Sequence, residues 1–328
     1  QACNQLKKLH GEGSFVFSVE RLVSGGENEN EDCFLCCLPG PGQGSSVTKL
    51  SKGDLQNLRN RLLLADIPES MAENRSLILE FVEKFRICED IDQGIRTLFR
   101  VGHFEFRMGF SHQMRVQEAT ADMLRRFLYS IRDALQSWRE QVAVCRSSFP
   151  HLNFFNAVQL FSLSSNFSHV RQGNHLIPAE LLDMLRLLDP TLDDHECNQL
   201  ARLLPANFEA LCAAEKLAAI GALLAEFFTD KVSQERTTSK TGTFLSSLTD
   251  VVARQVEVSY PVAVCLAESS EKTVDIILSL YGSIGRLPEP EEVLFCNQRT
   301  SFEDLEILLL RWVQGRRTGR DKRVFCVS

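Results

Sequence analysis

Apolar residues recur three and four positions apart through most of this chain, and this spacing constrains its fold more than any other feature. The pattern runs from about residue 49 to residue 257 and is typical of helices that bury one face. Proline and glycine interrupt it without a fixed period, so we predict an irregular helical array without tetratricopeptide or ankyrin repeats. The expected helices cover about residues 54–65, 77–99, 117–149, 154–163, 179–188, 194–204, 208–228 and 244–256, with a mobile loop at 229–243.

The longest expected helix, at 117–149, carries a heptad seam. Its apolar positions alternate spacings of four and three: Leu124, Leu128, Ile131, Leu135, Trp138, Val142 and Cys145. Such a seam is compatible with a coiled coil. Because Ala121, Phe127 and Ala134 widen the stripe, packing against several neighbours in a core is the favoured interpretation.

Strand patterns appear toward both ends of the chain. Near the N-terminus, two apolar runs at 15–19 and 33–38 flank a polar turn region and predict a short β-hairpin, which a Gly/Pro-rich linker follows. Near the C-terminus, apolar runs at 262–266, 293–296 and 324–327 alternate with two helices, at 271–281 and after a capping box formed by Thr300 and Glu303. This order predicts a small βαβαβ unit with a parallel sheet.

We therefore predict a mainly α fold in three parts. Residues 1–48 form a partial β-hairpin and linker, residues 49–257 the helical array, and residues 258–328 a small, truncated α/β linker unit. A length of 328 residues suffices for two or three domains. The chain begins with Gln1 and ends in an apolar run, so we expect both ends to lie inside a longer protein.

Charge and hydropathy exclude several classes of function. The net charge of −7 argues against broad binding to nucleic acids or acidic membranes. No apolar run reaches the roughly 18–20 residues of a transmembrane helix, and there is no signal peptide. One basic run is interpreted as a solvated loop, with an anion or partner contact as the alternative: Arg311, Arg316, Arg317, Arg320, Lys322 and Arg323.

The cysteines indicate a reducing compartment. There are eleven of them, an odd number, and most lie in apolar periodic segments, as buried reduced cysteines do. We therefore expect a cytoplasmic protein, in which the sequons at Asn74 and Asn166 are chance matches.

One segment partly resembles a phosphate-binding loop. Lys272 and Thr273 follow the apolar run at 262–266 and match the end of such a loop. Both glycines of the motif are absent, with Leu266 and Glu271 in their places, so we predict no nucleotide site here.

No metal or catalytic site is predicted either. Cys33, Cys36 and Cys37 have a ligand-like spacing, but a second pair is missing and His10 would be an accidental fourth ligand. His151, His169, His175 and His195 lie near turns or helix ends, where capping and solvated roles are common. Asp193 and Asp194 are interpreted as a helix cap with first-turn charge, and Asp189 with Pro190 as a helix end.

Several stretches nevertheless resemble the mysterin family of giant RING-finger ubiquitin ligases with an AAA+ core. In the order of the family, they are Ser51–Leu62, Trp138–Val142 with Leu152–Leu160, Pro288–Cys296 with Thr300–Leu305, and Arg323–Val327. The resemblance extends from about residue 49 to the end and implies a segment leading into the first AAA+ unit. It also implies a parent that hydrolyses ATP with Mg²⁺, binds Zn²⁺, transfers ubiquitin and is cytoplasmic or on lipid droplets. None of the family's catalytic motifs falls on a residue of this chain.

The leading hypothesis is a non-catalytic arm that couples or positions the motor and ligase modules of such a parent, with the rest of that polypeptide and the ubiquitin machinery as partners. A second hypothesis is a free-standing helical scaffold that binds a protein through an apolar face such as the seam at 124–145. A third is an enzyme whose cysteine–histidine site is assembled only in the fold.

Overall fold

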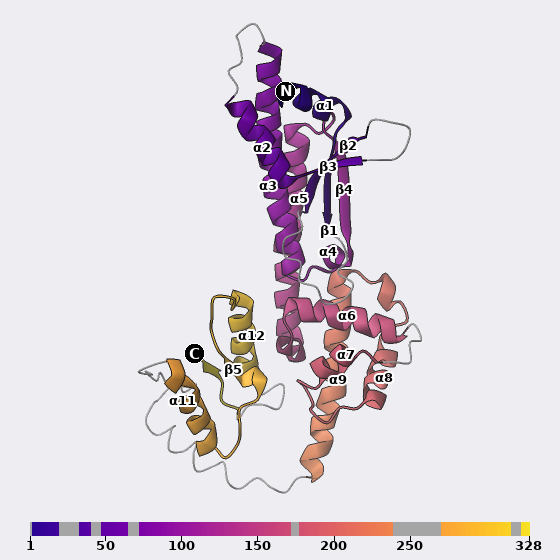
Figure 1. The fold of residues 1–328 in the computed structure, drawn as a ribbon. Coiled ribbons are helices and arrows are strands. Elements are labelled where there is room, and N and C mark those ends of the chain that lie inside the picture. Colours follow the sequence, from indigo (N-terminus) through magenta and orange to yellow (C-terminus); the bar gives the residue numbers. More distant parts are fainter. Residues whose placement is uncertain are drawn as a thin grey trace. The chain divides into compact units, whose positions relative to one another are not determined.

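A computed structural model describes residues 2–19, 33–40, 47–64, 72–171, 177–238, 270–315 and 323–328. Eleven α-helices and two small sheets lie in these residues, which confirms the mainly α fold class (Figure 1). The chain divides into two compact units. The first contains residues 1–143, 157–161 and 212–214, and the second contains 144–156, 162–211 and 215–328. Among the described helices, none is both long and apolar enough to cross a membrane.

The first unit contains a four-stranded antiparallel sheet in the order β3-β2-β1-β4. The predicted hairpin is confirmed as β1 (Ser14–Val19) and β2 (Phe34–Pro39). Two strands that we did not predict extend it, β3 (Val47–Ser51) and β4 (Phe110–Arg115). The Gly/Pro-rich segment that we interpreted as a linker connects β2 to β3, and its residues 41–46 lie outside the described part of the chain.

Helices cover one face of this sheet. They are α1 (Ala2–Glu12), which was not predicted, α2 (Lys52–Leu63), α3 (Ala72–Arg100), the short α4 (Phe104–Met108) and most of α5 (Ala121–Ser148). Aromatic side chains fill the core, where Phe34 stacks on Phe17 at 5.1 Å and also contacts Phe85 of α3. Phe127 of α5 contacts Phe17 at 5.6 Å, so α3 and α5 both pack on the inner side of the hairpin.

The heptad seam of α5 is buried, as the favoured interpretation predicted. Leu124, Leu128 and Ile131 belong to the core of the first unit. Trp138 is 2% exposed and donates its indole N–H to the carbonyl oxygen of Val101 at 2.9 Å. The seam is therefore an internal packing surface.

Helices of the second unit follow in short, uneven steps. They are η2 (Pro150–Phe154), α6 (Ala157–Arg171), α7 (Ala179–Leu185), α8 (Asp194–Leu203), η3 (Phe208–Ala210) and α9 (Ala213–Thr238), with the first residues of α6 and α9 in the first unit. The mobile loop predicted at 229–243 is wrong as far as Thr238, because no glycine or proline interrupts α9 there. The helix predicted at 244–256 lies outside the described residues.

The C-terminal part is an α/β arrangement. It contains α11 (Ser270–Ser283), η4 (Pro290–Glu292), β5 (Val293–Leu294), α12 (Phe302–Val313) and β6 (Cys326–Val327). β5 and β6 pair in parallel, as predicted, whereas the strand expected at 262–266 lies outside the described residues. The capping box is formed by Ser301 and Asp304, one residue later than predicted, because Thr300 instead accepts a bond from the backbone of Asn297.

The three predicted domain ranges stay predictions. The boundary at residue 257 falls outside the described residues. The hairpin of residues 1–48 shares its sheet with β3, which crosses the boundary at residue 48, and with β4, which lies beyond it.

Candidate functional site

The phosphate-loop-like segment is only partly described. Lys272 is exposed and Thr273 half-buried in the first turn of α11, while residues 267–269 lie outside the described part of the chain. The predicted absence of a nucleotide site therefore stays a prediction.

The N-terminal cysteines do not converge. Cys36 lies on the buried face of β2, opposite Phe15, and its neighbour Cys37 points to the other face of the sheet. Burial, with a smaller contribution from Cys37, raises the pKa of the Cys36 thiol to about 12, so this sulfur stays protonated. In the described residues, no group of three or more His, Cys, Asp or Glu side chains is placed to hold a metal ion.

The histidines lie apart from one another along the chain. His151 is buried in η2 against Phe228, His169 lies in the last turn of α6 and His195 is exposed on α8. His175 lies outside the described residues. Asp193 caps α8, as predicted, and accepts the backbone N–H of Glu196 at 2.8 Å.

One cluster of polar contacts in the second unit joins α12 to the end of α5 and to η2. Arg146 of α5 is 2% exposed, and its Nη2 donates to Glu303 of α12 at 2.6 Å and to the carbonyl oxygen of Phe155 at 2.8 Å. Asn153 of η2 is fully buried and donates to Gln314 at 3.1 Å, just beyond the end of α12. We call the residues Arg146, Asn153, Glu303, Arg311 and Gln314 the α12 joint.

Arg311 completes this joint. Its Nε donates to the carbonyl oxygen of Asn153 at 2.6 Å, its Nη1 donates to the carbonyl oxygen of Glu291 at 2.9 Å, and its guanidinium lies over the ring of Phe154. The interpretation of the basic run as a solvated loop is therefore wrong for Arg311, because α12 continues through this residue to Val313.

A second buried polar cluster holds β6 in place. Glu292 of η4 is completely buried and accepts two bonds from Arg286, at 2.7 and 2.9 Å, and one from Arg323 at 3.1 Å. Arg323 also pairs with Glu289, and Tyr281 donates to the carbonyl oxygen of the next residue, Val324, at 2.6 Å. We call Glu292, Arg286 and Arg323 the Glu292 clamp. Arg323 is thus a second member of the basic run that is held in ion pairs, with its side chain 25% exposed.

Neither cluster was predicted. Arg146 and Glu303 are separated by 157 positions, and nothing in a single sequence pairs residues at that distance. The signal that was available is local. Three glutamates, at 289, 291 and 292, stand directly before the apolar run of β5, where acidic residues are expensive unless paired.

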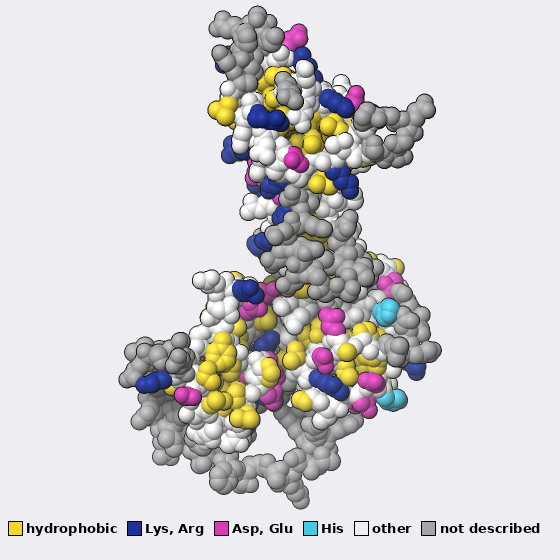
Figure 2. All heavy atoms as spheres, viewed as in Figure 1, with side chains coloured by type: hydrophobic (Ala, Val, Ile, Leu, Met, Phe, Trp, Pro, Cys, Tyr) yellow, Lys and Arg dark blue, Asp and Glu magenta, His cyan; other side chains and the backbone are white. Residues whose placement is uncertain are grey.

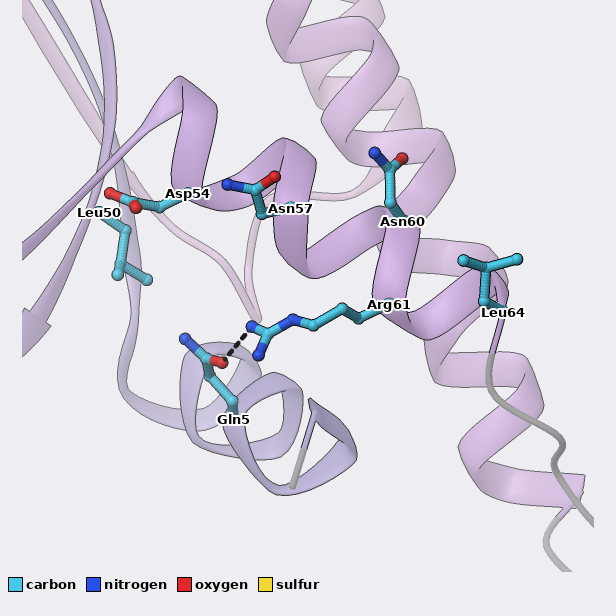
Figure 3. A pocket seen from close by; sticks show the side chains of 7 residues that line it. All are labelled: Gln5, Leu50, Asp54, Asn57, Asn60, Arg61 and Leu64. Carbon is cyan, nitrogen blue, oxygen red and sulfur yellow. Dashed lines mark hydrogen bonds between the residues drawn. The ribbon is translucent and has the colours of Figure 1, made fainter.

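An open hollow of about 530 Å³ lies between α1, α2 and β3 of the first unit (Figure 3). Arg61 donates to Gln5 across it at 3.1 Å, and Asp54 on its wall already caps α2 through Ser51. The remaining lining residues are Leu50, Asn57, Asn60 and Leu64. Because Arg61 and Asp54, the charged residues of the lining, already make these contacts, the hollow does not indicate a catalytic site.

Comparison with known proteins found a match for the C-terminal part of the chain. Residues 263–328, about one fifth of the sequence, match the family model of the RNF213 AAA domain, RNF213 being mysterin. No curated protein matches the chain. The matched residues include α11, β5, α12 and β6, and therefore both the Glu292 clamp and one side of the α12 joint. We had expected this segment to precede the first AAA+ unit, whereas the matching model is an AAA domain itself. The match supports an origin of this segment in a mysterin-like AAA+ protein.

Proposed function

We propose that the chain is a non-catalytic arm of a mysterin-like AAA+ protein, which holds the start of an AAA domain on a helical support. The observation that carries this proposal is the α12 joint. Glu303, Arg311 and Gln314 lie within the segment that matches the AAA domain, whereas Arg146 and Asn153 lie in the helical part that does not.

The residues of the joint share one face of α12. The joint residues Glu303, Arg311 and Gln314 follow one another at spacings of eight and three positions, and buried Ile307 lies midway between the first two. These spacings place all four residues along one side of a helix. Directional bonds from arginine and asparagine specify one docking position, whereas an apolar contact alone tolerates sliding. Arg146 Nε and Asn153 Oδ1 are buried without a hydrogen-bond partner in the described structure, so the joint stabilises less than its number of bonds suggests.

Exposed apolar residues lie on a second side of α12. They support packing of residues 263–328, which we call the AAA-like segment, against more of an AAA domain. Phe302, Leu309 and Val313 are 81%, 45% and 59% exposed, and their spacing places them on a different face from the joint. Hydrophobic side chains gather over this C-terminal part of the molecule in Figure 2. Apolar surface of this kind is usually covered by a neighbouring part of a protein.

The wider functions belong to the parent in this proposal. ATP hydrolysis with Mg²⁺, Zn²⁺ binding by the RING finger, ubiquitin transfer and residence in the cytoplasm or on lipid droplets are expected of the parent. The arm itself positions the motor relative to the ligase module.

The joint is testable by hydrogen–deuterium exchange of the chain. Arg146→Met keeps most of the side-chain length but removes the bonds to Glu303 and Phe155, so we expect amides of α12 to exchange about tenfold faster or more. Arg139→Met is the matched control, because Arg139 is exposed on the same helix. Equal exchange in both variants would remove the support for a joint, and ATP turnover by the chain alone would contradict a non-catalytic arm.

The rival scaffold hypothesis loses the surface that motivated it. Leu124, Leu128, Ile131 and Trp138 of the seam are all at most 6% exposed. A partner cannot bind these side chains without unfolding the first unit.

A further inference from the structure

In the described part of the chain, no strand pairs with the outer edge of the sheet in the first unit, which is β4. β4 pairs with β1 on one side only and ends the strand order, as Figure 1 shows. Its six residues pair with β1 in one continuous antiparallel register, from Ser14 with Arg115 to Val19 with Phe110. The alternation of bonded and non-bonded pairs decides which backbone groups of β4 this pairing leaves unused.

Two hydrogen bonds show which residues of β4 bond to β1 and which do not. Val116 N–H donates to the carbonyl oxygen of Gly13 at 2.9 Å, at the end of the β1–β4 register. On the other side of β1, Ser18 N–H donates to the carbonyl oxygen of Cys33 at 2.9 Å. Because antiparallel pairs alternate between bonded and non-bonded, both bonds assign Phe110, His112 and Met114 as the residues of β4 that bond to β1.

The backbone N–H and C=O groups of Ser111 and Gln113 therefore point away from the sheet. Both residues are exposed, and neither has a further hydrogen bond in the described part of the chain. The open run ends at Arg115, whose carbonyl oxygen accepts from Glu118 and Ala119. The edge thus offers four free groups in a row.

This edge also lacks the usual protection against strand addition. Proteins guard exposed edges with lysine, proline or a bulge. The opposite edge strand, β3, has Lys49 at its centre, whereas β4 has no lysine or proline, and its register contains no bulge. Nothing in the sequence of β4 therefore prevents its exposed edge from pairing with another strand.

We propose that the β4 edge binds a second copy of this chain, with the two β4 strands antiparallel about an axis at His112. In this register Ser111 faces Gln113 of the second copy, so the four open groups of each strand bond to those of the other. Phe110 faces Met114 of the second copy on the core side of the sheet, an apolar aromatic–sulfur pair.

Charge is compatible with the same register. Arg115, the only permanently charged residue of β4, faces Gly109 of the second copy and not its own equivalent. His112 faces His112 of the second copy at the axis. A foreign strand would need a similar alternation of a weakly apolar and a polar face, and the β4 strand of a second copy already has it. This inference does not depend on the proposed function.

The register can be tested by charge substitution at exposed positions. In S111K/Q113K, lysines face lysines at both Ser111–Gln113 pairs, so like charges repel across the axis. In S111E/Q113K, the matched control, glutamates face lysines at the same two pairs. Circular dichroism checks that both variants keep the fold, which the exposure of both positions favours.

Sedimentation velocity at pH 8 between about 1 and about 200 μM measures the outcome. We expect concentration-dependent dimers of the unmodified chain, about tenfold or more weaker association in S111K/Q113K, and unchanged or tighter association in S111E/Q113K. A chain that stays monomeric overturns the proposal, as does a dimer that both variants weaken equally or that S111K/Q113K leaves intact. A monomer that binds an isolated extended peptide of unrelated sequence along β4 would assign the edge to a foreign strand instead.

Discussion

Replacing Glu292 by glutamine removes one negative charge from a position without solvent access and leaves the side-chain volume almost unchanged. The carboxylate accepts bonds from Arg286 at 2.7 and 2.9 Å, from Arg323 at 3.1 Å and from the backbone N–H of Glu289 at 3.0 Å. Breaking a buried ion pair by removing one partner costs about 3–5 kcal/mol. The two arginines are 30% and 25% exposed and can turn toward water, so we expect the lower end, about 3 kcal/mol.

The loss should appear where the clamp acts, at the pairing of β5 with β6. Cys296 N–H donates to Ser328, and Ser328 N–H donates to Leu294, at 2.6 and 2.9 Å. A local cost of about 3 kcal/mol corresponds to about 100-fold faster hydrogen exchange of these two amides. Asp275→Asn on α11 is the control, because it makes the same change of charge at an exposed position. If Glu292→Gln exchanges no faster than this control, the clamp does not hold β6.

Two further predictions concern backbone space and thiol chemistry. Gly102→Ala should lower the free energy of unfolding by about 2 kcal/mol or more, seen as a lower apparent unfolding temperature, because φ is +72° and a Cβ would overlap the backbone of Ala157. Gly282→Ala is the control and should not lower it, because the space around Gly282 is open. Iodoacetamide at pH 7 to 9 should label exposed Cys296 but neither Cys36 nor Cys197, since burial raises their thiol pKa values to about 12 and 11; mass spectrometry showing labelled Cys36 in folded protein would refute this.

Local patterns predicted most of the helices. Helix α5 was expected at 117–149 and spans Ala121–Ser148, since seven apolar positions repeat without a glycine or proline among them. The parallel pairing of β5 and β6 also followed from local order, because a helix between two apolar runs requires a crossover connection. The cap of α12 was missed by one residue, since Thr300–Glu303 and Ser301–Asp304 have the same spacing. Thr300 accepts a bond from the backbone of Asn297 and Glu303 accepts one from Arg146, which leaves Ser301 and Asp304 to form the cap.

The edge strands could not be predicted in this way. β4 reads Phe-Ser-His-Gln-Met-Arg, in which one face is polar and the other only weakly apolar, so its strand character depends on pairing with β1 nearly a hundred residues earlier. The paired arginines were missed for a related reason. Arg146 is buried, and Arg311 and Arg323 are half-buried. All three look like surface residues until their partners are known, because the pairing of a charge is decided by distant contacts.

The two polar clusters of the C-terminal part act on different connections, and together they explain why so short a sheet can persist. A parallel pair of two-residue strands has little stability of its own. The Glu292 clamp fixes β6 to η4 directly before β5, while Arg311 of α12 bonds to Glu291, the neighbouring residue of η4, and to Asn153 of the helical support. Glu291 and Glu292 thus connect both clusters within two residues. A change at the support that moves Arg311 is therefore positioned to reach the sheet of the AAA-like segment through η4, which is what a positioning arm requires.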